Sequence, residues 1–179
     1  MRVISGNSRG RKLVTPEGFD VRPTSDSVKE SVFNIIQNDI EGRRVLDLFA
    51  GTGQIGIEFL SRGAAEVVFI DSSRTSLNIV KKNLSLCGFK AETMCMDALD
   101  YIKRAGKFDL IYIDPPYDTE LYEAVLSSIN SIDILSVGGI IICESRREKM
   151  LPDMHSPYNK VKEYCYGKIK ITTYRRENQ

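Results

Sequence analysis

The sequence predicts a single α/β domain built on a mostly parallel sheet with helices on both faces. From residue 44 onward, short apolar runs alternate with stretches of helical periodicity. A glycine-rich turn joins the first run to the first of these helices, and the end of the chain alternates with a period of two. Strands that alternate with helices indicate parallel pairing, because a crossover helix brings the chain back to the same edge.

The first 42 residues are predicted to form an extension before a core domain at residues 43–179. Short extended segments at Arg2–Ile4 and Lys12–Thr15 flank a turn rich in glycine, asparagine, serine and arginine, which predicts a small hairpin. A helix follows, in which Ser27 and Glu30 have the spacing of a capping box. Its apolar face is formed by Val28, Val32, Ile35 and Ile36.

The core is predicted to hold five strands with helices between them. The helix at Gln54–Arg62 ends before Gly63 and that at Ser73–Cys87 before Gly88, both plausible caps. The tail around Gly167 indicates two antiparallel strands. A further helix is marked by Leu121, Val125, Leu126 and Ile129. The five strand patterns lie at Val45–Phe49, Glu66–Asp71, Ala91–Met96, Leu110–Asp114 and Gly139–Glu144.

Composition narrows the class of protein. The chain has 179 residues, 42% of them hydrophobic and 27% charged, which suits one globular domain with a sizeable core. It has no apolar run of membrane-spanning length and no signal-peptide pattern, so we expect a soluble cytoplasmic protein without a membrane partner.

Metal binding is not indicated by the cysteines or the histidine. No two cysteines stand in a Cys-x-x-Cys pair, and His155 has no neighbouring ligand set. Reduced structural thiols are therefore expected, with no metal. The cysteines are Cys87, Cys95, Cys143 and Cys165.

The net charge of +1 hides basic segments at both ends of the chain. Residues 1–16 carry Arg2, Arg9, Arg11 and Lys12 without an acid. Together the two ends could form one surface that binds a polyanion, or they could be two solvated strand faces. Residues 160–176 carry Lys160, Lys162, Lys168, Lys170, Arg175 and Arg176 against Glu163 alone.

The turn Gly51-Thr-Gly53-Gln-Ile-Gly56 matches a dinucleotide-binding pattern, yet the acids around it favour S-adenosylmethionine. Asp47 opens the turn, where a carboxylate suits an ammonium and a sulfonium and suits a pyrophosphate poorly. Asp71 ends the second strand, where it can bind ribose hydroxyls, and Asp97 follows the third strand, placed to meet the adenine amine. Each acid could instead be a helix N-cap.

The tetrapeptide Asp114-Pro-Pro-Tyr117 follows the fourth strand and indicates chemistry on an amine. An exocyclic amine of a nucleobase is a poor nucleophile, because its lone pair is delocalised into the ring. A carboxylate from Asp114 and a carbonyl from Pro115 could accept its hydrogens, and Tyr117 could stack on a flipped base. The sulfonium is already activated, so positioning supplies most of the catalysis.

These motifs resemble the class I S-adenosylmethionine-dependent methyltransferases, and four stretches together resemble the RsmD family of bacterial 16S rRNA guanine-N2 methyltransferases. The stretches are RVISGNSRGRKL, RPTSDSVKESVFNII, VLDLFAGTGQIGIE and DLIYIDPPY. The resemblance covers nearly the whole chain and implies a Rossmann-like sheet of order 3-2-1-4-5-7-6 with the seventh strand antiparallel. Ser27 and Lys29 stand where the family usually has arginine.

The resemblance also implies residue roles, with small-subunit rRNA or a 30S particle as partner and a monomeric enzyme. The expected catalytic residues are Asp114, Pro115, Pro116 and Tyr117. The RNA contacts expected from the basic N-terminal segment itself are Arg9, Arg11 and Lys12. The expected cofactor contacts are Arg22, Thr24, Asp47, Phe49, Ala50, Gly51, Gly53, Asp71, Ser72, Asp97 and Ala98.

Other readings of the motifs stay open at this point. An amino methyltransferase acting on adenine N6 or on glutamine would use the same reaction motif, although enzymes that read DNA sequence usually carry an added recognition domain. An NAD(P)-dependent oxidoreductase would explain the glycine-rich turn but not Asp47 or Asp114. An RNA-binding module without activity would leave both motifs unused.

Overall fold

The computed structural model describes residues 1–16, 26–116 and 120–177. The strands are β1 (Arg44–Asp47), β2 (Glu66–Asp71), β3 (Glu92–Cys95), β4 (Phe108–Ile113), β5 (Leu135–Arg146), β6 (Tyr158–Tyr166) and β7 (Ile169–Arg176). The helices are α1 (Asp26–Ile35), α2 (Gln54–Ser61), α3 (Arg74–Cys87), α4 (Ala98–Ile102) and α5 (Leu121–Ile132), with a 3-10 turn, η1, at Gln37–Asp39.

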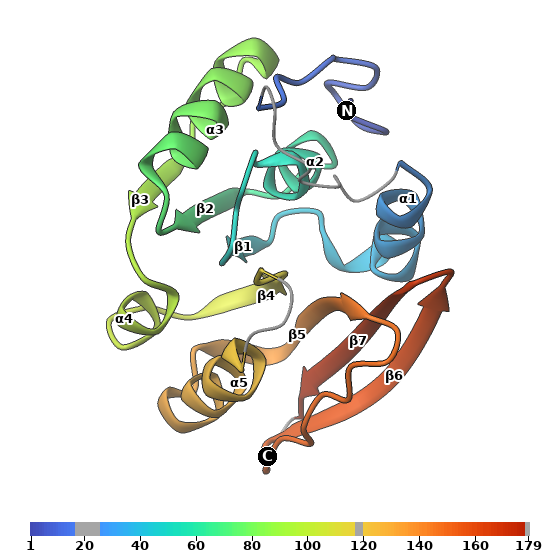
Figure 1. Cartoon of the computed structure of the whole chain (residues 1–179), viewed down its shortest axis with the longest axis vertical. Coiled ribbons are helices and arrows are strands. Elements are labelled where there is room, and N and C mark those ends of the chain that lie inside the picture. Colours follow the sequence, from blue (N-terminus) through green and yellow to red (C-terminus); the bar gives the residue numbers. More distant parts are fainter. Residues whose placement is uncertain (17–25, 117–119, 178–179) are drawn as a thin grey trace.

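All seven strands form one sheet in the order β3-β2-β1-β4-β5-β7-β6 (Figure 1). The strands from β3 to β5 pair in parallel, whereas β7 runs antiparallel to both β5 and β6. The predicted strand order and the antiparallel last strand are therefore confirmed. Parallel pairing brings the carboxyl ends of β1 to β5 to one edge of the sheet.

Helices cover both faces of the sheet, with α1, α2 and α3 on one side and α4 and α5 on the other (Figure 1). A hydrophobic core lies on each face of the sheet, and the side chains of a strand alternate between the two. In β1, Val45 packs in the core beneath α1, α2 and α3, and Leu46 packs in the core beneath α4 and α5. In β2 the run from Val67 to Ile70 is fully buried, because a central parallel strand is covered on both faces.

The predicted elements are present, with ends that differ by a few residues. β2 has the predicted bounds. α3 ends at Cys87, and its C-cap is Gly88, whose φ of 73° lets its amide donate to the carbonyls of Leu84 and Ser85. The C-cap of α2 is Arg62, and Gly63, with φ of 96°, comes directly after it. β5 is longer than predicted, because it pairs with β4 on one side and β7 on the other.

Three local predictions need correction. Helix α4 was not expected, since five residues are too few to show a period. Ser27 is the second residue of α1, so the capping box with Glu30 is not formed. The N-terminal hairpin is reduced to one antiparallel bridge between Arg2 and Lys12, with the turn between them closed by backbone bonds to Val3.

None of the helices formed by the described residues is long and apolar enough to cross a membrane.

Candidate active site

The glycine-rich turn connects β1 to α2 with a backbone that only glycine adopts readily. Gly51 and Gly53 have φ of 53° and 77°, in the left-handed region. Gly56 has a different reason: a Cβ there would lie 2.1 Å from the ring of Phe69. The first two glycines therefore shape the turn, and the third lets α2 pack closely on β2, as in nucleotide-binding βα units.

Asp47 lies beneath this turn at the end of β1. Its side chain is buried, and Oδ2 accepts the backbone amide of Gly56 at 3.0 Å. Burial raises the pKa of Asp47 to about 7; the Gly56 hydrogen bond opposes this rise and the charge of Asp71 adds to it. A cation placed at the turn would favour the ionised form of Asp47.

Asp71 ends β2 and binds backbone on both sides. Its Oδ2 accepts the amide of Gly51 at 2.8 Å, and Oδ1 accepts the amide of Ser73 at 2.8 Å. Ser72, between Asp71 and Ser73, is exposed. Asp71 thereby couples the glycine-rich turn to the loop after β2.

Asp97 follows β3 and caps α4. Its Oδ1 accepts the amides of Leu99 and Asp100 at 2.8 and 3.3 Å. This is the helix N-cap role that the sequence leaves open as an alternative. The side chain is exposed, while Ala98 is buried and Phe49 and Ala50 lie in the turn after β1. A cap and a ligand contact are compatible, because both capping bonds use one oxygen.

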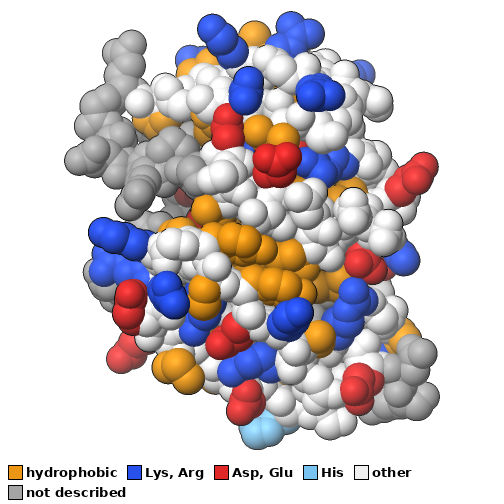
Figure 2. Space-filling view, turned by 90° about the vertical axis from the view of Figure 1, so that its right-hand side faces the viewer, with side chains coloured by type: hydrophobic (Ala, Val, Ile, Leu, Met, Phe, Trp, Pro, Cys, Tyr) orange, Lys and Arg blue, Asp and Glu red, His pale blue; other side chains and the backbone are white. Residues whose placement is uncertain are grey.

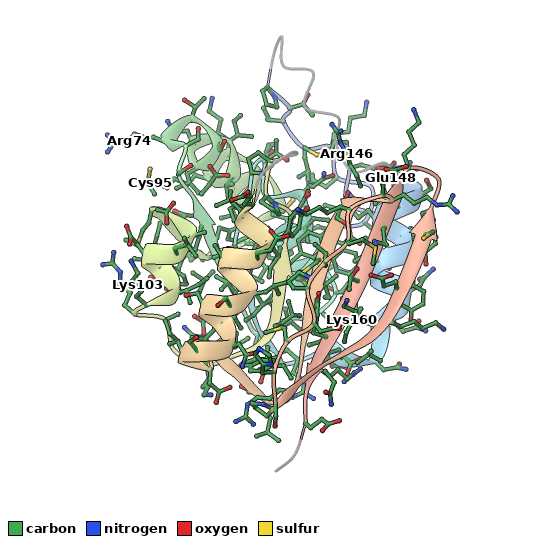
Figure 3. All side chains as sticks on the ribbon, turned by 60° about the horizontal axis from the view of Figure 1, so that its bottom comes forward. Arg74, Cys95, Lys103, Arg146, Glu148 and Lys160 are labelled. Carbon is green, nitrogen blue, oxygen red and sulfur yellow. The ribbon has the colours of Figure 1, made fainter. Side chains whose placement is uncertain are left out.

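The three acids are gathered by the sheet. β3, β2 and β1 are neighbours in that order, so Asp97, Asp71 and Asp47 follow or end adjacent strands on one edge. Figure 3 shows this edge at the top, where Arg74 and Cys95 lie on the side of β2 and β3 and Arg146 on the side of β5.

The reaction motif continues the same edge on β4. β4 pairs with β1, and Tyr112 accepts the amide of Leu48 at 3.1 Å through its backbone carbonyl, so the motif adjoins the cofactor turn. Asp114 is half-buried, Pro115 is buried and Pro116 is exposed. Burial, then the charges of Glu144 and Asp47, raise the pKa of the Asp114 carboxyl well above its usual range. Tyr117 lies outside the described residues.

Glu144 is a residue of this site that the sequence interpretation missed. It lies on β5 with 1% of its surface exposed, and its Oε2 accepts the hydroxyl of Tyr112 at 2.5 Å. Its backbone carbonyl accepts the hydroxyl of Tyr122, also at 2.5 Å. The available signal was an acid directly after the apolar run Ile140–Cys143, where a strand buried on both faces would otherwise carry no charge.

The basic residues Arg9, Arg11 and Lys12 are exposed on the N-terminal loop. The loop is fastened at the C-terminal ends of α2 and α3, where the amide of Asn7 donates to Ser61 at 2.8 Å and the hydroxyl of Ser8 to Cys87 at 3.3 Å. The N-terminus of α2 is at the glycine-rich turn. The three cations therefore lie at the far end of α2 from the site.

The C-terminal cations are largely neutralised by acids. Lys160 pairs with Asp153 at 2.9 Å and Lys170 with Glu163 at 3.4 Å. On the face toward the viewer in Figure 2, blue and red side chains are interspersed in the lower half. Figure 1 shows the β6–β7 hairpin separated from the N-terminal loop by α1. Arg175 pairs with Asp39 at 3.3 Å, and Arg176 with Asp133 at 2.8 Å.

Lys29 has a structural role, in holding the N-terminal segment against α1. Its side chain is fully buried, its ammonium donates to the carbonyl of Arg2 at 2.5 Å, and it lies 3.9 Å from Oε2 of Glu58. It therefore ties α1 to the N-terminal segment, while Ser27 is exposed. Arg22 and Thr24, expected as cofactor contacts, lie outside the described residues.

Asn83 makes the corresponding contact beside the cofactor turn. From α3, it accepts the amide of Val14 at 2.7 Å and donates to the carbonyls of Val14 and Thr52 at 3.2 and 2.9 Å.

The described residues contain no group of three or more His, Cys, Asp or Glu side chains that could hold a metal ion.

A glycine-rich turn, acids at three successive strand ends and an Asp-Pro-Pro motif on the next strand define a class I methyltransferase. Residues 1–175 match the family model described as Conserved hypothetical protein 95, and the chain belongs to this family, that of RsmD.

Two curated relatives and one solved structure illustrate the similarity. Ribosomal RNA small subunit methyltransferase D of Haemophilus influenzae is 36% identical over 84% of this chain and 81% of its own length. The Escherichia coli protein of the same name is 32% identical over 100% of this chain and 91% of its own. The solved structure of yhhF from Escherichia coli has a TM-score of 0.89 at 30% identity, covering 100% of this chain and 99% of that chain.

Proposed function

We propose that this protein transfers a methyl group from S-adenosylmethionine to the exocyclic N2 amine of a guanine in small-subunit rRNA. Its family and the names of its relatives support the reaction and the kind of substrate. The observation that carries the proposal is the position of Asp114. It follows β4, which pairs with β1, and β1 leads into Asp47 and the glycine-rich turn that fit the cofactor.

The described residues fit a cofactor that carries positive charge. When bound, S-adenosylmethionine supplies a methyl group on a positively charged sulfur. Asp47 would hold its ammonium group, because the pKa of about 7 lets a nearby cation ionise this carboxyl. Asp71 would bind ribose hydroxyls and Asp97 the adenine amine, each while keeping its bonds to backbone amides.

The reaction motif would orient the amine. Asp114 would accept one N–H of the guanine amine and the carbonyl of Pro115 the other, which turns the nitrogen lone pair out of conjugation with the ring. Tyr117 would stack on the base after it leaves its neighbours. Because the methyl donor is already activated, holding nitrogen and carbon in line supplies most of the rate enhancement.

An exposed basic surface away from the active site supports a macromolecular substrate. Arg9, Arg11 and Lys12 are exposed at the other end of α2, where they would bind phosphates of RNA that extends beyond the target base. A small basic loop gives little recognition by itself, so we infer that an assembled or partly assembled 30S particle is the substrate. The enzyme would act as a monomer in the cytoplasm, where this particle is found.

The alternatives use the site less completely. An NAD(P)-dependent oxidoreductase would place a pyrophosphate beside Asp47, where a carboxylate repels it. Methylation of adenine N6 or of glutamine remains a chemical possibility for the same motif, and the experiment below separates these products from N2-methylguanosine.

The deciding experiment is transfer of labelled methyl groups to small-subunit particles and to naked 16S rRNA from a strain that lacks this activity, followed by nucleoside analysis. The expected product is N2-methylguanosine, formed faster on particles. N6-methyladenosine in the RNA, or label in protein, would overturn the assignment.

A matched variant locates the chemistry in the same assay. Asp114→Ala is expected to lower the single-turnover rate by orders of magnitude, while calorimetry shows S-adenosylhomocysteine bound as in the wild type. An active Asp114→Ala enzyme would remove Asp114 from the reaction.

A further inference from the structure

Glu144 lies in β5, and Asp114 directly follows β4, the neighbouring parallel strand. Ile113 of β4 pairs with Cys143 of β5, so Asp114 and Glu144 occupy the next step of the same register. Tyr112 precedes Asp114 by two residues and therefore points to the same face of the sheet. Tyr112, Asp114 and Glu144 thus form one group of polar side chains at the reaction motif.

Glu144 is built into the core. Its side chain has 1% exposure, as does that of Tyr112, which donates its hydroxyl to Oε2 at 2.5 Å. The Tyr122 hydroxyl from α5 fixes the backbone carbonyl of the same residue at 2.5 Å. A buried carboxylate costs free energy even with such partners, and an apolar residue would continue the strand without that cost.

The groups that face Asp114 are mostly acids. Glu144 approaches from β5, Asp47 from β1 and Tyr112 from its own strand. Burial, and then the charge of Asp114, raise the pKa of the Cys143 thiol. Arg146, two residues beyond Glu144 on β5, is exposed. Burial first, and then the charges of Glu144 and Asp47, make the negative form of Asp114 unfavourable, so the pKa of this carboxyl lies above that of an ordinary aspartate.

We propose that Glu144 is a positioning residue for methyl transfer, whose charge makes Asp114 a sufficiently strong acceptor for the proton that leaves the amine. As the bond from nitrogen to the methyl carbon forms, the bond from sulfur to that carbon breaks and its electron pair stays on sulfur. The nitrogen then carries a positive charge until one N–H proton moves to Asp114, which later releases it to water. Glu144 itself does not touch the substrate.

The inference rests on the proposed function and predicts a pH profile. Asp114 must be ionised to take the proton, so the rate falls as pH falls through its pKa. Replacing Glu144 by an uncharged residue removes a neighbouring negative charge, which lowers that pKa. The acid limb of the profile then moves to lower pH.

The test measures single-turnover methyl transfer to small-subunit particles against pH, with cofactor saturating. Glu144→Gln is expected to move the acid limb down by about one pH unit and to lower the plateau rate about tenfold or more. Glu163→Gln is the matched control, because Glu163 lies on β6 and pairs with Lys170. This control is expected to leave both limb and plateau unchanged.

A second variant protects the test from a folding defect. Tyr112→Phe keeps the buried ring but removes the hydroxyl that donates to Oε2 of Glu144. This hydrogen bond favours negative charge on the Glu144 carboxyl, so its loss is expected to move the limb in the same direction by a smaller amount. If Glu144→Gln does not fold, the Tyr112→Phe profile decides. A folded variant with an unshifted limb overturns the role of Glu144, whereas a wild type without any transfer overturns the proposed function instead.

Discussion

The carboxylate of Asp71 at the end of β2 accepts a hydrogen bond of 2.8 Å from the amide of Gly51, in the turn after β1. The other oxygen of Asp71 accepts the amide of Ser73 at the same distance. One side chain thus fixes two loops that border the cofactor site. Loss of Asp71 would loosen the glycine-rich turn and would also remove the ligand contact proposed for this carboxylate.

We therefore expect Asp71→Ala to weaken binding of S-adenosylhomocysteine by about 1–3 kcal/mol, the scale of an unmet buried polar partner. Asp71→Asn keeps one acceptor oxygen and is expected to fall between Ala and wild type. Asp100→Ala, on the exposed surface of α4, serves as the control. Calorimetry measures all four proteins, and equal affinities would remove Asp71 from the site.

The cofactor half of the site could be proposed from the sequence because its three acids lie at or near the ends of recognisable strands. The run Val67–Ile70 is fully buried, so its end at Asp71 is clear, and the glycines of the next turn need no tertiary information. Sequence order alone also suggests that such ends meet, since parallel strands share an edge.

Glu144 also ends a predicted strand, but its role could not be read from that position. Its significance depends on the register between β4 and β5, which brings it beside Asp114, and on the hydroxyl of Tyr112 reaching it. Neither contact has a local signature. The pairing of Arg175 with Asp39, 136 residues earlier in the chain, is hidden for the same reason.

Close packing at Gly56 gives a prediction for stability. A methyl group there would lie 2.1 Å from an atom of the Phe69 ring and 2.9 Å from Oδ2 of Asp47. Gly56→Ala is expected to lower the free energy of unfolding by about 1–3 kcal/mol, the usual cost of overpacking. Urea denaturation measures the loss. Gly106→Ala is the control, because its Cβ would meet only the flexible side chain of Arg44, at 3.3 Å.

A second substitution tests whether that clash is the cause. Gly56→Ala with Phe69→Leu is expected to cost less than the two single changes together, because the smaller side chain makes room for the methyl group. Strictly additive losses would mean that the ring of Phe69 is not what excludes a side chain at position 56.

Lys29 and Glu58 attach the N-terminal segment to the core. Glu58 accepts the amides of Ile4 and Ser5 at 2.8 and 3.0 Å and also pairs with Arg62 at 2.8 Å. Lys29→Met is expected to destabilise the protein by about 1–3 kcal/mol, because the Arg2 carbonyl loses a buried donor and Glu58 loses the nearby positive charge. Thermal unfolding measures the effect, with exposed Lys103→Met as the control.

Glu58→Ala is expected to act on the segment itself. Hydrogen exchange at the amides of Ile4 and Ser5 would speed up, while exchange in β4 changes little. Unchanged protection of these two amides would show that the segment is held by other contacts.

Asp133 connects the end of α5 with the last strands and gives a pH-dependent prediction. The Arg176 guanidinium, together with Lys107 and the Tyr158 hydroxyl, holds the pKa of this carboxyl below its usual range despite partial burial. A lowered folded-state pKa means that the carboxylate stabilises the fold above about pH 4, and that this contribution is lost as pH falls through the folded-state value.

Asp133→Asn is therefore expected to lower Tm at pH 7, with a difference from wild type that shrinks as pH falls below about 4. Asparagine tolerates the φ of 59° at this position, so the backbone is preserved. Asp153→Asn, at an 86% exposed side chain, is the control. A Tm difference that stays constant down to pH 2 would assign the effect to something other than the charge.

The N-terminal loop provides the last prediction, which separates RNA binding from chemistry. Arg9, Arg11 and Lys12 are exposed at the far end of α2 from Asp114, so they can hold phosphates without influencing the reacting atoms. Replacing all three with glutamine is expected to raise KM for the particle and to reduce the salt dependence of binding by about two counterions. The single-turnover rate at saturating substrate would stay close to wild type.

A triple variant with Lys81, Lys82 and Lys103 changed to glutamine removes the same charge from other exposed positions, and it is expected to leave the salt slope nearly unchanged. If both variants weaken binding equally, net charge rather than the loop attracts the RNA; if neither does, the loop cations are a solvated surface.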